Sequence, residues 1–242
     1  MKQRLRFDSD KNNLVGNFYF PSKKGTFPGV LFIHGAGNSS AIRYQQIQGR
    51  LAEKGVASFC FDMRGVQDSK GKFEDGSLNN RLVDSINAYR CFIGTGLVDA
   101  KRVGLFGSSM GAHVACRLLE KAKIKAVVLQ CGAAYGLEAE DKKLDETFTN
   151  VIRKEKSWQG SPAFLLLKNF LGPVCVIYGE QDAVIPQKVR ELYGKSLKKS
   201  DVYKIFPGIG HNLLKPLSPE EENITRDIIS YTINFFVSKL KK

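Results

Sequence analysis

The chain has 242 residues, of which 43% are hydrophobic and 25% are charged. This length suits one large α/β domain, and the supply of apolar side chains excludes a disordered chain, because their burial offsets the entropy lost on folding. The formal net charge is +13, from 37 basic and 24 acidic residues spread over the whole chain. We interpret this excess as a basic surface that aids solubility or steers anionic substrates, and we expect no nucleic-acid partner.

The cysteines and the N-terminus indicate a cellular compartment. Five cysteines are present, each among apolar residues and none in a CxxC pair. An odd number of such cysteines is typical of buried free thiols in a reducing environment. The N-terminus has no apolar run of the signal-peptide kind, and no window reaches about 18 uninterrupted apolar residues. We therefore expect a soluble cytoplasmic protein without a membrane span.

Strand and helix patterns alternate along the chain. A turn at 11–13 separates segments 3–7 and 14–20, which we expect to pair as an antiparallel hairpin. Continuous apolar runs, typical of strands buried on both faces of a parallel sheet, recur at 29–33, 56–61, 102–106, 125–130, 173–178 and 202–206. Helical patterns lie at 41–54, 78–93, 111–122, 187–197 and 220–239. The alternation predicts a doubly wound, mostly parallel α/β sheet of about eight strands, with helices on both faces.

One segment interrupts this alternation. Residues 132–170 lie between two predicted strands, are too long for a single crossover helix and contain two helix-prone stretches. We predict a single domain over 1–242 in which 132–170 is a small cap over the strand ends, where active-site lids commonly lie. Two ordinary surface helices are the alternative.

A G-x-S-x-G pattern follows a predicted strand and opens a predicted helix. It consists of Gly107, Ser109 and Gly111, directly after the strand at 102–106. A sharp turn at this point leaves no room for flanking side chains and projects the central hydroxyl out of the sheet. The helix N-terminus adds partial positive charge where negative charge develops. Ser109 is therefore the candidate nucleophile, and the neighbouring Ser108 is not at the central position.

With these residues the chain resembles the α/β-hydrolase family, in particular its small esterase, acyl-peptidase and dienelactone-hydrolase branch. The resemblance extends from about Gly29 to about Leu214. It implies an oxyanion hole formed by two backbone N–H groups. One belongs to Ala36, in the HGAG turn after the first parallel strand, and the other to Met110, directly after the candidate nucleophile. The D-x-R-G turn at 62–65 also matches the family, and its implied role is structural.

The resemblance also implies an acid and a base, in the chain order serine, acid, histidine. The turn at 179–186 resembles the family's G-x-x-D-x-x-x-P pattern and implies Asp182 as the acid, with Glu180 as the alternative. The strand at 202–206 leads into a G-x-x-H pattern that implies His211 as the base.

The other two of the three histidines have different interpretations. His34 belongs to the HG turn, where we expect a structural role. His113 lies on the helix after the candidate nucleophile, where we expect a packing or surface residue. His211 is the histidine with the position and the order that a triad requires.

These residues predict a serine hydrolase that cleaves an ester or related acyl bond of a small or medium substrate through an acyl-enzyme, with no metal or other cofactor. Candidate walls of the acyl pocket are Trp158, Phe164 and Phe170, and core packing of cap helices is the alternative interpretation. Amide, peptide and thioester hydrolases, C–C hydrolases and cofactor-free haloperoxidases use the same triad. Two other classes stay open: a non-catalytic ligand-binding module on this fold, and a nucleic-acid or membrane-surface partner driven by charge.

Overall fold

The central β-sheet has eight strands in the part of the chain that the computed structural model describes, residues 1–22, 24–37 and 39–241. The strands are β1 (Lys2–Ser9), β2 (Asn12–Tyr19), β3 (Phe27–Ile33), β4 (Ala57–Phe61), β5 (Val98–Ser108), β6 (Ala126–Gln130), β7 (Val174–Gly179) and β8 (Val202–Phe206). Their order across the sheet is β1-β2-β4-β3-β5-β6-β7-β8. β2 runs antiparallel to both β1 and β4, and every other neighbouring pair is parallel. The mostly parallel sheet with an N-terminal hairpin is therefore confirmed.

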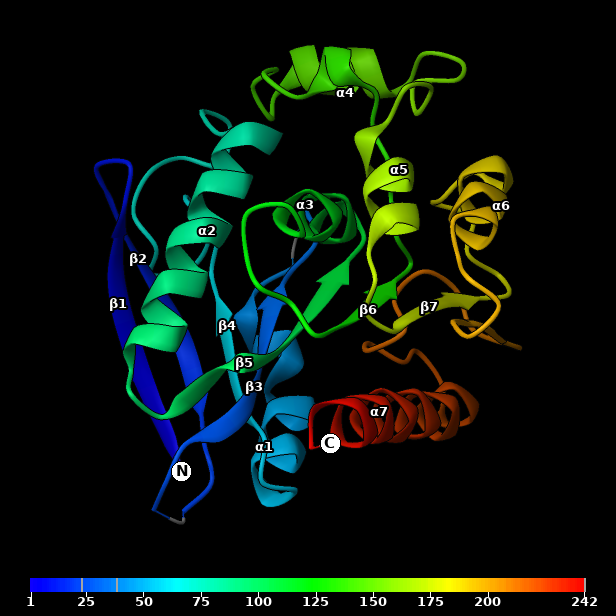
Figure 1. Ribbon diagram of the computed structural model, residues 1–242. Coiled ribbons are helices and arrows are strands. Elements are labelled where there is room, and N and C mark those ends of the chain that lie inside the picture. The colour runs from blue at the N-terminus through cyan, green and yellow to red at the C-terminus, as the bar shows by residue number, and fades with distance from the viewer. Residues whose placement is uncertain (23, 38, 242) are drawn as a thin grey trace.

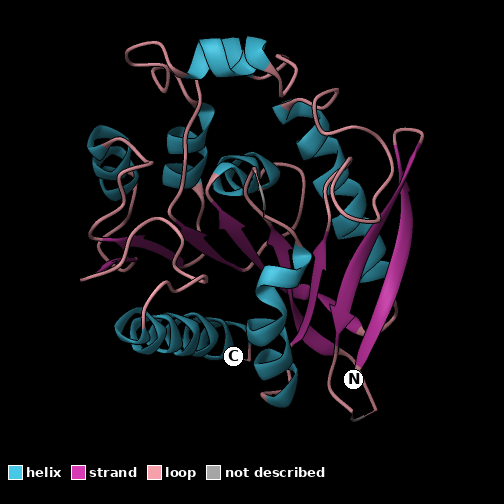
Figure 2. Ribbon diagram, turned by 180° about the vertical axis from the view of Figure 1, so that it is seen from behind, coloured by secondary structure: helices cyan, strands magenta, loops and turns pink. Residues whose placement is uncertain are grey.

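Helices cover both faces of the sheet. They are α1 (Gln45–Glu53), α2 (Leu78–Gly94), α3 (Met110–Leu118), α4 (Glu146–Ile152), α5 (Pro162–Asn169), α6 (Gln187–Lys195) and α7 (Pro219–Leu240), with short 3-10 turns η1 (Ala41–Tyr44) and η2 (Leu137–Ala139). α1 and α7 lie on one face, and α2, α3, α5 and α6 lie on the other (Figures 1 and 2). This arrangement explains the continuous apolar runs, because β4, β6 and β7 are buried along their whole length. The doubly wound α/β fold class is confirmed.

Two element boundaries differ from the sequence-based expectation. β5 begins at Val98, four residues before the apolar run at 102–106. The apolar pattern does not include these first residues, because they are partly exposed and several of them are polar. Its early residue Val98 pairs with Phe27, with a register irregularity before the main parallel pairing. α3 ends at Leu118 rather than near 122, since the backbone tightens there and Leu119 donates to the carbonyl of Cys116, three residues back.

α7 packs closely on the middle of the sheet. Phe236 of α7 is fully buried, and a Cβ at Gly104 of β5 would lie 2.8 Å from its ring. The absence of a side chain at Gly104 therefore permits this close approach. On the same face of the sheet, the rings of Phe32 and Phe106 pack with centroids 4.9 Å apart. These contacts hold together β3 and β5, the two strands whose ends carry the residues of the site described below.

The segment 132–170 contains η2, α4 and α5. α4 lies outside the helical layer, beyond α3, while α5 returns to the sheet next to α6 (Figures 1 and 2). Gly136 donates to the carbonyl of Ser157 at 2.8 Å, so the two ends of the excursion around α4 are joined by a backbone hydrogen bond. The segment is therefore tied back to itself before it enters α5.

The cysteines of the described chain are free thiols, and Cys60, Cys116, Cys131 and Cys175 are buried. Desolvation by burial raises the pKa of the Cys116 thiol to about 12, which keeps it protonated. Among the described residues, no helix is both long and apolar enough to cross a lipid bilayer.

Removal of the Phe236 ring tests the packing of α7. We expect Phe236→Ala to lower the free energy of unfolding by about 3–5 kcal/mol, because a large cavity forms where relaxation is limited. Leu171→Ala is the matched control: its side chain is 94% exposed, so its loss leaves the unfolding free energy nearly unchanged. Urea denaturation measures both, and equal effects of the two substitutions would contradict this packing.

Candidate active site

Ser109 occupies the turn between β5 and α3 in a strained backbone conformation. Its φ is 52° and its ψ −121°, a region that residues with a side chain rarely adopt. The turn is held from two sides: the Ser109 N–H donates to the carbonyl of Gln130 at 2.9 Å, and its carbonyl accepts from Ala112 at 3.0 Å and Ala133 at 3.1 Å. These bonds to β6, to α3 and to the chain beyond β6 stabilise the strained geometry.

The glycines that flank the turn permit close packing of α3 on the sheet. A Cβ at Gly107 would lie 2.7 Å from the Cα of Ala112. A Cβ at Gly111 would lie 2.6 Å from the carbonyl oxygen of His34, where the chain leaves β3. Both positions therefore exclude any larger residue, as the sequence pattern indicated.

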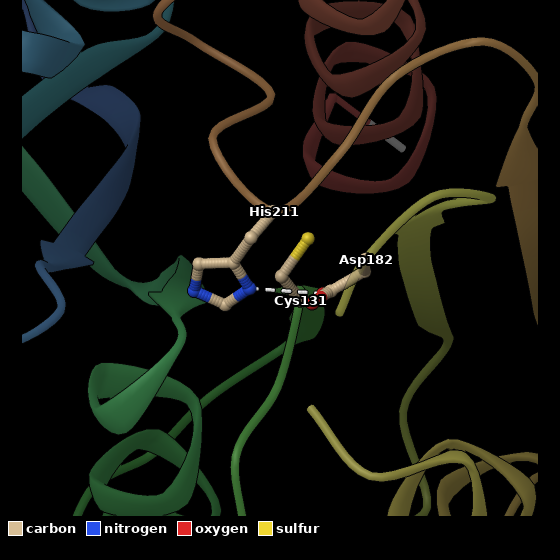
Figure 3. A group of neighbouring side chains, drawn as sticks. All are labelled: Cys131, Asp182 and His211. Atoms are coloured by element: carbon tan, nitrogen blue, oxygen red, sulfur yellow. Dashed lines mark hydrogen bonds and ion pairs between the residues drawn. The ribbon is translucent and has the colours of Figure 1, made fainter. Parts of the chain in front are cut away.

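His211 contacts both Ser109 and Asp182. Its Nε2 lies 3.1 Å from the hydroxyl oxygen of Ser109, and its Nδ1 lies 2.9 Å from Oδ2 of Asp182. Figure 3 shows the imidazole ring directed toward the Asp182 carboxylate. The three side chains come from the loops after β5, β7 and β8, so the parallel sheet brings together residues that are distant in the sequence. Because an ionised carboxylate only accepts, Nδ1 donates to Asp182 and Nε2 accepts from the Ser109 hydroxyl.

The carboxylate of Asp182 is held by its own turn. Its Oδ1 accepts from the backbone N–H groups of Val184 at 2.9 Å and Ile185 at 3.1 Å, which leaves Oδ2 for His211. Burial alone raises the pKa of Asp182, but the hydrogen bond and charge of His211, together with these backbone donors, outweigh it. The pKa of Asp182 therefore lies below its ordinary value, and the group is ionised at neutral pH.

The alternative acid, Glu180, and the neighbouring Ser108, which the sequence analysis set aside, are not the partners of His211. Glu180 is exposed, and its carboxylate accepts from the backbone N–H of Gly208 at 3.3 Å. Ser108 is the last residue of β5, one position before the turn. The structure thus brings Ser109 and Asp182 to His211.

His34 is a buried neutral link between two loops. Its Nε2 accepts from the backbone N–H of Met63 at 3.0 Å, and its Nδ1 lies 2.7 Å from the carbonyl of Gly35. Burial, with a contribution from the charge of Arg81, lowers the pKa of His34 to about 3. The ring joins the HG turn to the D-x-R-G turn, in agreement with the structural role that we expected for it.

His113 ties α3 to the segment 132–170. Its Nδ1 accepts from the backbone N–H of Tyr135 at 3.4 Å, and its Nε2 donates to Glu140 at 2.9 Å. Arg117, one turn further along α3, also binds the Glu140 carboxylate. Burial lowers the pKa of His113, and the Glu140 carboxylate opposes this effect. The histidine is therefore a packed residue, as expected, and it anchors the segment next to Ser109.

Two cavities meet at Ser109. The larger one has a volume of about 180 Å³ and is lined mainly by apolar residues, from the segment 132–170 and from the turn after Asp182. The smaller one has a volume of about 70 Å³ and is polar, and His211 and Ala36 contribute to its lining. A Cβ at Gly35 would lie 3.1 Å from the Cβ of Ser109, so the HGAG turn passes directly beside the serine. Met110, the other expected oxyanion residue, is the first residue of α3.

The aromatic residues expected in the substrate pocket have different positions. Trp158 lines the larger cavity. Among the described residues, Phe164 and Phe170 do not line it: the Phe164 ring packs on Tyr193 with centroids 5.1 Å apart, and Phe170 lies in a separate groove beside Ile124. Phe164 lies on the side of α5 that contacts α6, and Phe170 is the residue at which α5 ends and the chain becomes extended.

The sequence analysis missed several residues that line the two cavities. In the larger cavity these are Tyr135, Ile152, Val184, Ile185, Pro186 and Val189. In the smaller cavity they are Ser39, Arg43, Gln130, Asn212, Leu213 and Leu214. Several of them are close in sequence to the HGAG turn, the acid turn or the final histidine, and residues after a strand end share its edge of the sheet. Ile152 belongs to α4, so only the packing of that segment brings it to the cavity.

Cys131 completes a group of side chains with atoms that metals bind. Its Sγ, a carboxylate oxygen of Asp182 and a ring nitrogen of His211 lie within 4.8 Å of one another (Figure 3). Burial and the nearby Asp182 charge raise the pKa of the Cys131 thiol well above its ordinary value. Metals bind the thiolate form, and Asp182 and His211 are already hydrogen-bonded to each other. We therefore interpret the three side chains as the hydrogen-bonded pair of Asp182 and His211 with the neutral thiol of Cys131 beside it, and not as a set of metal ligands.

The buried neutral His34 predicts a pH dependence of stability. Its folded pKa of about 3 lies below the ordinary value of 6.5, so between these values the unfolded chain binds more protons. The contribution of neutral His34 to the free energy of unfolding is complete above pH 6.5. It decreases as the pH is lowered toward 3, by up to about 1.4 kcal/mol per pH unit. We expect His34→Gln to have a shallower pH dependence of its unfolding free energy in this window than the native protein. Equal slopes in urea titrations would contradict the assignment.

Comparison with known proteins places the chain in a family. Residues 27–161 match the family described as serine aminopeptidase, S33. An uncharacterized protein of Mycobacterium tuberculosis is 27% identical over 82% of this chain and 68% of its own length. Esterase EstD of Thermotoga maritima is 23% identical over 86% of this chain and 60% of its own length.

Solved structures with low sequence identity share the fold. Est1E from Butyrivibrio proteoclasticus with bound ferulic acid has a TM-score of 0.72 at 21% identity, with 98% of this chain and all of that chain covered. The acylaminoacyl peptidase of Pyrococcus horikoshii has a TM-score of 0.74 at 20% identity, with 100% of this chain and 42% of that chain covered. Because the matched family covers more than half of the chain and includes the G-x-S-x-G turn, this protein belongs to the serine aminopeptidase S33 family of α/β hydrolases.

Proposed function

We propose that this protein is a serine hydrolase that cleaves an ester bond of a small or medium acyl substrate through an acyl-enzyme. The observation that carries the proposal is the chain of hydrogen bonds from Ser109 to His211 to Asp182, with Ser109 on a strained turn between two cavities. A serine hydroxyl is a weak nucleophile and needs an adjacent base, and the base needs an orienting acid. The distances of 3.1 Å and 2.9 Å meet this requirement.

The proposed reaction uses His211 twice. Its Nε2 takes the proton of Ser109 as Oγ adds to the substrate carbonyl, and it gives the proton to the leaving oxygen when the tetrahedral intermediate collapses. Water then repeats both steps and releases the acid. Asp182 holds the Nδ1–H tautomer and stabilises the imidazolium that forms between the two transfers.

The oxyanion of the intermediate is assigned to the backbone N–H groups of Ala36 and Met110. The HGAG turn passes beside Ser109, and Met110 begins α3, whose N-terminus favours negative charge. Removal of one oxyanion donor typically costs about 3–4 kcal/mol of transition-state stabilisation.

The whole chain 1–242 serves as one catalytic unit in this proposal, with 132–170 as a cap. Support comes from the anchor of Glu140 on His113 and Arg117, and from the contribution of Tyr135 and Trp158 to the larger cavity. The volume of this cavity, about 180 Å³, is modest and favours a short acyl chain or a small ring over a long lipid chain.

The charges around Ser109 favour ester hydrolysis over the release of an N-terminal amino acid. An aminopeptidase binds a protonated α-amino group, for which a carboxylate is the natural partner. Among the described residues, neither cavity is lined by an Asp or a Glu, and the smaller one contains Arg43. Amides and thioesters of uncharged acyl groups fit the same site and are tested beside esters.

Substitution of the three side chains tests the assignment. We expect Ser109→Ala and His211→Ala to lower kcat on para-nitrophenyl butyrate by about 10⁴-fold or more, because each removes the nucleophile or its base. Asp182→Asn should leave a measurable residue of activity. Circular dichroism checks that each variant is folded, and normal ester hydrolysis by folded Ser109→Ala would overturn the proposal.

An active-site label distinguishes the enzyme from a silent binding module. We expect a fluorophosphonate to modify Ser109 in the native protein, because an activated serine attacks the phosphorus. Ser108→Ala should retain the label, while Ser109→Ala should lose it; peptide mass spectrometry reads the modified position. Absence of label from the folded native protein would favour the non-catalytic alternative.

A further inference from the structure

The smaller cavity at Ser109 is polar and small. Besides Ser109, His211 and the HGAG turn, its lining includes Ser39, Arg43 and Asn212. Its volume of about 70 Å³ is less than half of the 180 Å³ of the larger cavity. The size and the polar lining of this cavity favour a compact polar group over an acyl chain or an aromatic ring.

Arg43 gives this cavity a positive charge. It lies in η1, and its Nη1 donates to Oδ1 of Asn212 at 3.4 Å, which holds the guanidinium beside the residue that follows His211. No carboxylate is among the described side chains that line the cavity. A guanidinium is matched in shape and charge to a carboxylate, with which it forms parallel hydrogen bonds.

Gln130 provides a second, independent sign of a ligand. Its side chain is 97% buried, and within the described part of the chain its Oε1 has no hydrogen-bond partner. An unpaired buried polar group is destabilising, so a retained one indicates a ligand or a water molecule that pairs with it. Its backbone carbonyl is already occupied by Ser109, so the side chain is the group left to bind a ligand.

The position of His211 assigns the two cavities to the two halves of a substrate. The leaving oxygen has to receive its proton from His211, which lines the smaller cavity and, among the described residues, not the larger one. The leaving group therefore enters the smaller, cationic cavity, and the acyl group enters the larger, apolar one.

We propose that the smaller cavity binds a carboxylate on the leaving group, so that the substrates are short apolar acyl esters of small hydroxy acids. This inference rests on the proposed function. In the reaction, Ser109 Oγ bonds to the carbonyl carbon and the bond from that carbon to the leaving oxygen breaks. The hydroxy acid departs with the proton that His211 took from Ser109, and water later releases the acyl group as a carboxylic acid.

A matched pair of esters tests this subsite. Carboxymethyl butyrate and carbamoylmethyl butyrate have the same number of heavy atoms and differ in the charge of the leaving group. We expect Arg43→Gln to lower the ratio of their kcat/KM values, charged over neutral, by about tenfold or more, because a charge-assisted hydrogen bond is lost. The intrinsic reactivity of each ester is the same with either enzyme, so the change in the ratio reports the cavity.

Control variants separate the local charge of Arg43 from the general basic surface. Arg50→Gln removes an arginine from the neighbouring α1, where it donates to Ser230 at 3.2 Å, and should keep the native ratio. Arg43→Lys should keep part of the preference. If Arg43→Gln fails to fold by circular dichroism, the native protein decides: a preference for the charged ester that added salt abolishes would come from the general basic surface and would overturn the proposal, because a charge pair inside a cavity is screened much less.

The outcomes distinguish the subsite from the proposed function. An unchanged ratio in folded Arg43→Gln overturns the subsite while ester hydrolysis stands. Native cleavage of para-nitrophenyl butyrate but of neither matched ester also overturns the subsite alone. If the native protein cleaves none of the three esters and takes no fluorophosphonate label, both the proposed function and this inference fail.

Discussion

The backbone strain at Ser109 is the constraint on which the rest of the site depends. A residue with a side chain at a φ of 52° costs on the order of 1–3 kcal/mol and persists where its surroundings hold it. Here the hydrogen bonds to Gln130, Ala112 and Ala133 hold it. Such a turn also requires α3 to approach β3 so closely that Gly111 cannot carry a side chain. The strained turn, the short helix and the buried strand ends are therefore one structural unit.

The other two side chains reach Ser109 because the strands are parallel. β6 lies between β5 and β7, yet the loops after β5, β7 and β8 leave the sheet at the same edge. The Asp182 turn is held by two backbone N–H groups, so the carboxylate is oriented before it contacts His211. This rigidity gives the hydrogen-bond chain its geometry without further support from the substrate.

The segment 132–170 is fixed beside the serine and lines the larger cavity. Through Glu140 it is bound to His113 and Arg117 on α3, the same helix that begins beside Ser109. Apolar residues of this segment line the larger cavity, whereas η1 supplies Arg43 to the smaller one. Two chemically different compartments therefore meet at one hydroxyl. In the proposed function, the substrate is determined by the chemical difference between the two cavities. Membership of the family does not determine it, because a shared fold does not fix the ligand.

The sequence by itself determined the fold class and the residues that meet in the site. Apolar runs indicate strands buried between two helical layers, and a G-x-S-x-G pattern after such a run indicates a sharp turn from strand to helix. The sequence reveals these strands and this turn because each depends on residues that are neighbours along the chain. The apolar pattern does not reveal the polar start of β5, because these residues are not buried on both faces of the sheet. Tertiary structure alone decided the cavities. Trp158 lines one, while Phe164 and Phe170 pack elsewhere, and Arg43 and Gln130 meet at the other from η1 and β6. A cavity is formed by side chains from several elements, and no local pattern in the sequence reports how those elements pack against one another.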